Sequence, residues 1–294
     1  MYVSTNGDEW VYQDGDQGHW NFTDPNLNPC SLSDQWQGLN CTFLSSDSSS
    51  CCYHISEILL SNYNLRGTIP ESIGNFSELY YLDLSINSLV GSLPTTISAL
   101  VSLKIIDLFS NALTGTIPSS MMNLIQLKIL NFRYNYLNGT IPNSLLNLSS
   151  LNNLILEFNY LTGSLPAEIG ELNLLTEFSF YSNHLQGTIP TSICELTSVK
   201  LIALGQNYFS GTIPSCVSNL DLIEYLLLDD NMFSGTFPST LGSLKSIKNF
   251  SRQFVDKLYT RYIRQFYPIV CFIHPAQSFH WIDAHLSSRC IIVD

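Results

Sequence analysis

Two cysteines and three histidines near the carboxyl terminus are the residues best suited to hold a metal ion: Cys271, His274, His280, His285 and Cys290. Thiolate and imidazole groups are common zinc ligands, and structural zinc sites usually draw them from closely paired motifs such as Cys-x-x-Cys. The spacing here is irregular and contains no such pair. We therefore predict that the chain binds no metal ion and uses no cofactor.

Serine, histidine and acidic residues could together support nucleophilic catalysis. That chemistry requires a base beside the nucleophile and a third group that orients the base. His184 could meet Glu157 or Glu177, but only on an open surface without a pocket. The sequence has no phosphate-binding loop and no paired-carboxylate motif. We predict a protein that is not an enzyme.

The charge balance argues against two classes of partner. The chain has 12 basic and 24 acidic residues, and its formal net charge is −12. Such a surface repels nucleic acid and anionic membranes, so we expect neither as a partner. The best apolar run, from Tyr267 to Ile273, is far shorter than the roughly 20 residues that cross a bilayer, so we expect no membrane span.

The other cysteines are candidates for disulfide bonds: Cys30, Cys41, Cys51, Cys52, Cys194 and Cys216. The adjacent Cys51 and Cys52 can hardly bond each other without strain. Cys194 and Cys216 fall at nearly matching places in successive segments of a sequence repeat, where either a bridge or two buried thiols would fit. The clustering of four cysteines near the amino terminus suggests an oxidising compartment.

Six Asn-x-Ser/Thr triplets also favour an extracellular or cell-surface protein, because such triplets are acceptors for N-glycosylation. They are Asn21, Asn40, Asn75, Asn138, Asn147 and Asn249. The residues after Met1 do not resemble a secretory signal, which favours either a truncated start or, alternatively, a cytoplasmic protein.

A period of 24 residues organises most of the chain, from residue 55 to residue 246. Proline, glycine and asparagine each recur at this step, which is the signature of a repeat architecture. The prolines fall at 70, 94, 118, 142, 166, 190, 214 and 238, and the glycines each lie three residues earlier. The asparagines are Asn87, Asn111, Asn135, Asn159, Asn183, Asn207 and Asn231.

Each unit is predicted to contain a short strand followed by a short helical turn. Apolar residues alternate from Leu82 to Leu84, and residues three apart such as Ile73 and Phe76 suit a 3-10 turn. The asparagine carries both a donor and an acceptor, so it can satisfy backbone groups where the strand bends. Stacked units cover one another's apolar edges and share a growing parallel sheet.

We therefore predict an α/β repeat solenoid, a right-handed superhelix or horseshoe. Its parallel sheet lies on the concave face, and its short 3-10 or helical turns lie on the convex side. The expected domains are a cysteine- and tryptophan-rich cap at 1–54, eight repeats at 55–246, and a divergent cap or non-repeat tail at 247–294, which a mis-joined reading frame could also explain.

The unit pattern L-x-x-L-x-L-x-x-N-x-L-x-G-x-I-P, seen at residues 103–118 and 127–142, resembles the plant-type leucine-rich repeat. The amino-terminal Trp10, Trp20, Pro29-Cys30 and the segment from Trp36 to Cys41 resemble the cap that precedes such repeats. This resemblance implies a disulfide bond between Cys30 and Cys41. Relatives of this kind include ectodomains of receptor kinases and receptor-like proteins, and inhibitors of polygalacturonases.

Two neighbouring columns of residues after Leu84 are predicted to face the concave surface. They bring together an exposed aromatic and charged patch: Phe109, Arg133, Tyr134, Glu157, Phe158 and Tyr181. Aromatic residues and arginine dominate binding hot spots, so we expect these six to contact a partner. The alternative is that variable positions of a solenoid have simply drifted to any tolerated residue.

These features predict a non-enzymatic recognition or scaffold module that binds a protein, peptide or glycan on its concave surface. The alternatives are a structural, wall-associated protein and the truncated ectodomain of a receptor kinase. The variable positions do not reveal which ligand is bound, and the sequence does not reveal the oligomeric state.

Overall fold

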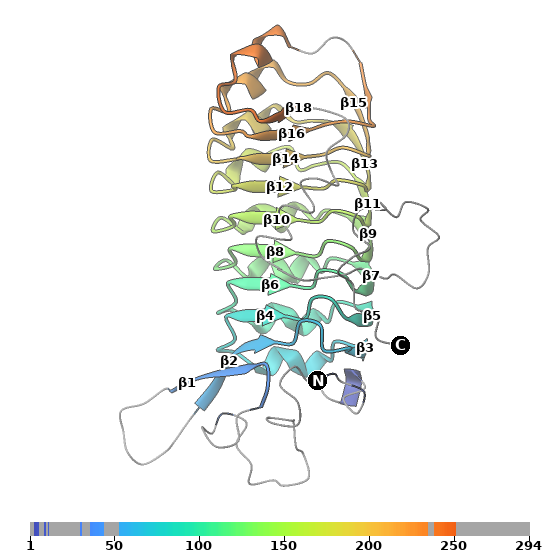
Figure 1. Cartoon of the computed structure of the whole chain (residues 1–294), viewed down its shortest axis with the longest axis vertical. Helices are drawn as coiled ribbons and strands as arrows, with labels where there is room; N and C mark the ends of the chain where they lie inside the picture. The colour runs from blue at the N-terminus through green and yellow to red at the C-terminus, as the bar shows by residue number, and fades with distance from the viewer. Residues whose placement is uncertain are drawn as a thin grey trace, which may run out of the picture. The chain divides into compact units, whose positions relative to one another are not determined.

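The computed structural model describes residues 3–5, 9, 11, 30, 36–43, 53–234 and 238–250. Over the repeats, every 24-residue unit forms one coil, and successive coils stack in register (Figure 1). Each coil contains a three-residue strand, a bend, a second strand and a 3-10 turn. The predicted repeat solenoid with a parallel sheet is therefore confirmed.

The first strand of each coil joins one sheet, which has ten strands in the described part of the chain. All neighbours after β2 pair in parallel, and β1 pairs with β2 antiparallel. The strands are β1 (Leu39–Phe43), β2 (Tyr53–Leu59), β4 (Tyr81–Asp83), β6 (Ile105–Asp107), β8 (Ile129–Asn131), β10 (Asn153–Ile155), β12 (Glu177–Ser179), β14 (Leu201–Ala203), β16 (Tyr225–Leu227) and β18 (Asn249–Phe250). Because β18 pairs with β16, this sheet continues past residue 246.

A second parallel sheet, which we did not predict, runs beside the first. It is built from the segment between the asparagine and the proline of each unit. Its strands are β3 (Arg66–Thr68), β5 (Ser88–Ser92), β7 (Ala112–Thr116), β9 (Tyr136–Thr140), β11 (Tyr160–Gly163), β13 (His184–Thr188), β15 (Tyr208–Gly211) and β17 (Met232–Phe233).

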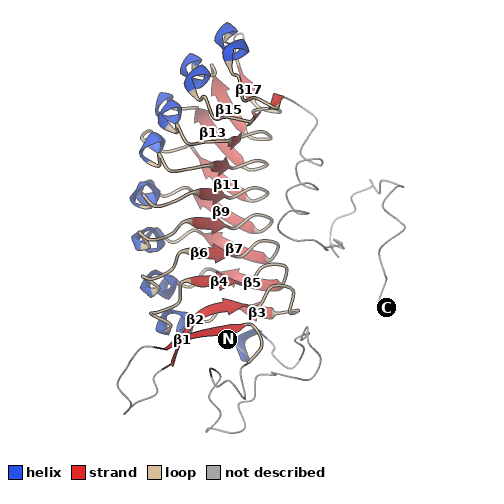
Figure 2. Cartoon of the chain, turned by 60° about the vertical axis from the view of Figure 1, so that its left-hand side comes forward, coloured by secondary structure: helices blue, strands red, loops and turns tan. Residues whose placement is uncertain are grey.

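Short 3-10 turns close the coils on the side away from the strands (Figure 2). Most begin directly after the repeat's proline, whose fixed φ suits the entry to a helical turn. They are η3 (Glu71–Asn75), η4 (Thr95–Ala99), η5 (Ser119–Asn123), η6 (Asn143–Asn147), η7 (Ile169–Glu171), η8 (Thr191–Glu195), η9 (Ser215–Asn219) and η10 (Ser239–Ser243), with η1 (Val3–Thr5) near the amino terminus.

One continuous apolar core fills the coils. Leucine, isoleucine and phenylalanine from both sheets and from the 3-10 turns are almost fully buried, among them Leu82, Ile97, Phe132 and Phe178. Each coil therefore covers the apolar edge of its neighbour, as stacking requires.

The repeated asparagine ties each coil to the one before it. Asn135 Nδ2 donates to the carbonyl oxygens of Leu108 (2.9 Å) and Phe132 (3.1 Å), and its Oδ1 accepts from the amide of Leu113 at 3.0 Å. Equivalent bonds recur at Asn87, Asn111, Asn159, Asn183, Asn207 and Asn231. The amide side chain satisfies buried backbone groups that the bend leaves unpaired.

The first coil meets a cap where later coils meet another coil. Tyr63 stands at the asparagine position, and its carbonyl oxygen accepts from the amide of Val11 at 2.9 Å. Its hydroxyl bonds Gln37 at 3.4 Å, and Trp36 packs against the core. A disulfide bond joins Cys30 to Cys41.

A second disulfide bond joins Cys194 on η8 to Cys216 on η9, with Cα atoms 5.7 Å apart. It clips two successive coils together on the side of the 3-10 turns. Cys51, Cys52 and the five candidate metal ligands of the tail lie outside the described residues. Among the described residues, no helix combines the length and the apolar character that a membrane crossing requires.

Candidate functional site

The candidate site is the solvent-facing side of the first sheet, which we call the concave face. Residues that flank the buried leucine of each strand point to this face, because side chains alternate along a strand. Two columns of the concave face were not predicted from sequence. One contains Tyr81, Ile105 and Ile129, and the other contains Asp83, Asp107 and Asn131. The alternation around the buried leucines would have revealed them.

An unbroken series of aromatic contacts crosses four coils of the concave face. Tyr134 and Phe158 stack with their ring centroids 4.3 Å apart and their planes 3° apart. Phe109 meets Tyr134 edge-on at 6.0 Å, and Phe158 meets Tyr181 at 5.8 Å. The structure thus brings together the aromatic residues of the predicted patch.

The bend after the strand holds the two central rings. Tyr134 and Phe158 have φ values of 52° and 51°, in the left-handed region that bulky residues rarely adopt. Ser110 and Gln206 have the same conformation at the matching positions of other coils, so the bend belongs to the repeat. The repeat therefore sets the backbone direction from which these rings project.

Arg133 and Glu157 form an ion pair inside this aromatic cluster. The Nε atom of Arg133 lies 2.8 Å from Oε2 of Glu157, and the two side chains are only 13% and 11% exposed. The guanidinium group also lies over the rings of Tyr134 and Phe158, 5.1 and 5.4 Å from their centroids. Glu157 accepts a further hydrogen bond from the hydroxyl of Ser179. These contacts fix the pair in one arrangement.

Tyr181 extends the cluster toward the carboxyl-terminal coils. Its hydroxyl donates to Oδ2 of Asp229, two coils away, at 3.1 Å. Gly205 makes room for this contact, because a Cβ atom there would come within 2.6 Å of the Tyr181 ring and 2.8 Å of the Asp229 carboxylate. Burial, and then the charge of Asp229, raise the pKa of Tyr181, so it stays protonated as a donor.

The exposure predicted for the patch is wrong for three residues. Phe109 and Tyr181 are each 4% exposed, and Glu157 is 8% exposed. They pack against neighbours on adjacent coils and support the cluster from within. Tyr134 and Phe158 are half-buried and present most of the accessible part of the predicted patch, and Arg133 adds only a small exposed fraction of its side chain.

A buried acidic pair lies on the same face nearer the amino terminus. Asp83 and Asp107 are aligned on neighbouring strands, and both are buried. Burial raises the pKa of Asp83, although the hydroxyl and amide of Ser85 bond its carboxylate and oppose that shift. Burial and these two carboxylates also raise the pKa of Tyr81 to about 12.

The predicted glycosylation sites lie on more than one surface where the structure describes them. Asn75 and Asn147 are exposed at the ends of η3 and η6, and Asn138 is exposed on β9 of the second sheet. Asn40 is exposed on β1, where its amide bonds Glu57. Asn40 pairs with Glu57, which stands in the same strand column as Tyr81, so it lies at the amino-terminal end of the concave face. Asn249 lies in β18, and Asn21 lies outside the described residues.

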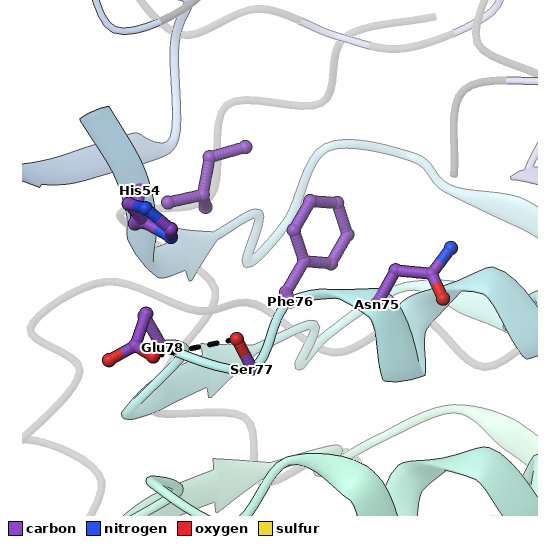
Figure 3. Close-up of a pocket in the computed structure, with 6 residues that line it drawn as sticks. His54, Asn75, Phe76, Ser77 and Glu78 are labelled. Carbon is purple, nitrogen blue, oxygen red and sulfur yellow. Dashed lines mark hydrogen bonds between the residues drawn. The ribbon is translucent and has the colours of Figure 1, made fainter. Parts of the chain in front are cut away.

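A hollow of about 200 Å³ beside the cap collects residue types that could do chemistry (Figure 3). It is lined by His54, Asn75, Phe76, Ser77 and Glu78, with Ile55. The Ser77 hydroxyl bonds the neighbouring Glu78 carboxylate at 3.5 Å, at the long limit of hydrogen bonding. A serine nucleophile needs a base within hydrogen-bond reach, so this arrangement supports no catalytic proposal.

Comparison with known proteins agrees with this architecture. The family model described as Leucine Rich Repeat matches residues 102–124, 126–148 and 222–244. Among solved structures, a plant peptide hormone receptor, RGFR1 in complex with RGF2, is 34% identical over 64% of this chain and 30% of that chain, with a TM-score of 0.63. This chain is a plant-type leucine-rich-repeat protein.

Two further relatives of this leucine-rich-repeat protein come from Arabidopsis. The ectodomain of the receptor kinase GASSHO1/SCHENGEN3 from Arabidopsis thaliana, in complex with CASPARIAN STRIP INTEGRITY FACTOR 2, is 32% identical over 81% of this chain and 30% of that chain, with a TM-score of 0.64. The Arabidopsis receptor kinase HAESA, in complex with the peptide hormone IDA and the co-receptor SERK1, is 29% identical over 76% of this chain and 40% of that chain, with a TM-score of 0.59.

The leucine-rich-repeat chain spans less than half the length of these relatives. A search of curated proteins found no match. The leucine-rich-repeat fold is established for this chain.

Proposed function

We propose that this leucine-rich-repeat protein is an extracellular or cell-surface recognition module that binds an extended peptide or protein segment along its concave face. Tyr134 and Phe158 are the aromatic anchors, and Arg133 is the charged contact. The stacked pair of rings with the guanidinium group over it is the observation that carries this proposal.

The cluster is ordered before any partner arrives. The ion pair, the ring contacts and the Tyr181–Asp229 hydrogen bond restrict its rotamers, so little side-chain freedom is left to lose on binding. Tyrosine and arginine are the residue types most enriched in binding hot spots. The half-buried Ile105 and Ile129 pair on β6 and β8 of the same sheet and add apolar area to the concave face.

A peptide or protein is the favoured partner for two reasons. The receptor kinase HAESA, solved in complex with the peptide hormone IDA, shares this architecture over 76% of the present chain. The disulfide bonds Cys30–Cys41 and Cys194–Cys216 fit an oxidising compartment, where secreted peptides are found.

Binding measurements on single variants test this function. Linear peptides selected by phage display against the folded chain would be titrated by calorimetry into the wild type, Tyr134→Ala and Phe158→Ala. We expect each substitution to weaken binding at least tenfold, as loss of a hot spot does. Val101→Ala, at an exposed residue beside η4, is the matched control and keeps the wild-type affinity. Unchanged affinity in both aromatic variants would refute the proposal.

A further inference from the structure

The outer face of the second sheet carries a file of aromatic rings that the proposed function does not use. Tyr136, Tyr160, His184 and Tyr208 occupy the same position in four successive strands, β9 to β15. Neighbouring ring centroids are 6.0, 5.6 and 5.9 Å apart, and the ring planes differ by 10° to 20°. Tyr160 and Tyr208 are 42% and 52% exposed. The file therefore presents ring edges and polar tips to solvent in a regular row.

The sheet around this file is free of Asp, Glu, Lys and Arg from β5 to β15. The segments are SLVGS, ALTGT, YLNGT, YLTGS, HLQGT and YFSG, and their outward positions hold mainly hydroxyl and amide side chains. The charged residues that give the chain its net charge of −12 therefore lie on other segments. Asp, Glu, Lys and Arg thus offer a charged ligand no counter-charge on these strands.

Packing between coils fixes the threonines of this face. A Cβ atom on Gly139 would lie 2.7 Å from the Cγ2 methyl of Thr116, and one on Gly163 would lie 2.9 Å from that of Thr140. Each methyl group thus sits against the glycine of the next coil. Threonine has few χ1 options, so its hydroxyl direction is set by the same contact.

A groove lies at the other end of the same strands. Its volume is about 570 Å³, and it crosses three coils between the second sheet and the 3-10 turns. The lining includes Ser92, Thr116, Thr140, Ser119, Pro118 and Pro142, with no charged side chain. The aromatic file and the groove meet at β9, where Tyr136 belongs to the file and Thr140 lines the groove.

We propose that this face binds a linear, uncharged polysaccharide that lies along the solenoid axis. Pyranose rings carry hydroxyl groups at their edges and apolar C–H groups on their faces. The phenol hydroxyls of the file match the sugar hydroxyl groups, and the exposed ring edges give the C–H groups an apolar contact. The six strands from β5 to β15 span roughly 24 Å, so a polymer makes one weak contact per coil and these contacts add up.

The test is affinity electrophoresis in gels that contain xyloglucan or mixed-linkage β-glucan, with microcrystalline cellulose pull-down as a second readout. A glycan on the exposed Asn138 would stand on this face, so every protein in the test carries Asn138→Gln. We expect retardation by at least one neutral polysaccharide and none by polygalacturonate, which is anionic.

Two variants examine the aromatic file and the groove. Tyr160→Ala combined with Tyr208→Ala removes exposed rings, and Ser119→Lys places a charge in the groove. Each should lower the apparent affinity at least tenfold, while Val101→Ala should leave it unchanged, and melting curves report that all variants fold. Absence of retardation by every neutral polysaccharide, retention by polygalacturonate alone, or equal retention of all variants would overturn the inference. None of these outcomes tests the proposed peptide binding by the concave face, which the Tyr134→Ala and Phe158→Ala variants examine separately.

Discussion

Arg133 and Glu157 show how a buried charge is tolerated on the concave face. The ion pair, the two aromatic rings and the Ser179 hydroxyl replace the water that each group lost. Removal of one partner from a buried pair leaves the other charge uncompensated. The two residues should therefore be energetically coupled.

We predict that Arg133→Ala lowers the free energy of unfolding by about 3 to 5 kcal/mol. The double variant Arg133→Leu with Glu157→Gln should recover most of that loss, because no unpaired charge remains. Urea titration of Arg133→Ala, of the double variant and of its two single variants measures the coupling energy. Additive losses would show that the two side chains do not act as a pair.

Asp83 should make stability depend on pH in a defined direction. Its pKa in the folded chain is raised by burial, so the folded state binds a proton more readily than the unfolded chain does. At neutral pH the folded state bears the free-energy cost of burying the ionised Asp83 carboxylate. This cost disappears as the pH falls below the ordinary aspartate pKa of about 4.

We therefore expect Asp83→Asn to raise the free energy of unfolding at pH 7. The gain should shrink as the pH is lowered through the raised pKa and should vanish below about pH 4. Thermal unfolding at several pH values measures this, with Asp221→Asn at an exposed position as the control. If the gain in the free energy of unfolding stayed constant with pH, the ionisation of Asp83 would not be its cause.

At the scale of elements, the second sheet depends on a glycine in each strand. Gly139 has a φ of 76°, which side-chain-bearing residues rarely adopt, and the methyl group of Thr116 fills the space beside it. We predict that Gly139→Ala lowers the free energy of unfolding by at least about 1 to 3 kcal/mol.

Gly242→Ala is the matched control for this prediction. Gly242 is exposed in η10, and nothing lies within 4 Å of a Cβ atom added there. Chemical denaturation should show its stability unchanged or slightly raised. Equal effects of the two substitutions would mean that the second sheet imposes no constraint on Gly139.

The elements show where prediction from sequence succeeds and where it fails. The strand, the bend and the 3-10 turn were predictable because leucine, asparagine, glycine and proline each repeat every 24 residues for a local reason. The second sheet was not, since segments such as Leu113-Thr-Gly-Thr116 carry a glycine where a strand would usually place an apolar side chain. Its pairing depends on how closely successive coils stack.

The sequence predicted which residues of the candidate site lie near one another, but it did not predict which of them are exposed. The repeat placed Phe109, Glu157 and Tyr181 near one another, but it could not show that they are buried. Their burial depends on residues 24, 25 or 48 positions away, such as Tyr134 for Phe109 and Gly205 and Asp229 for Tyr181. The exposure of a residue at a variable position therefore depends on which side chains the neighbouring coils carry.

At the scale of the whole repeat domain, stability depends on how well successive coils hold together. The Cys194–Cys216 disulfide closes a loop of about 22 residues between two coils near the end of the described stack. We expect the double variant Cys194→Ser with Cys216→Ser to lose about 3 kcal/mol of stability. Urea unfolding, with hydrogen exchange of the β14 and β16 amides, would detect it; unaltered stability would contradict a stapling role.

Recognition by the concave face is the central claim, and site-specific photo-crosslinking tests it most directly. The photoreactive residue p-benzoylphenylalanine would replace Ile129 on β8, Tyr160 on β11 or exposed Ile125 on the side of the 3-10 turns. Each protein would be irradiated with secreted proteins and peptides. We predict a protein or peptide adduct at position 129 and none at 125 or 160. Adducts at 125 or 160 with none at 129 would contradict the claim.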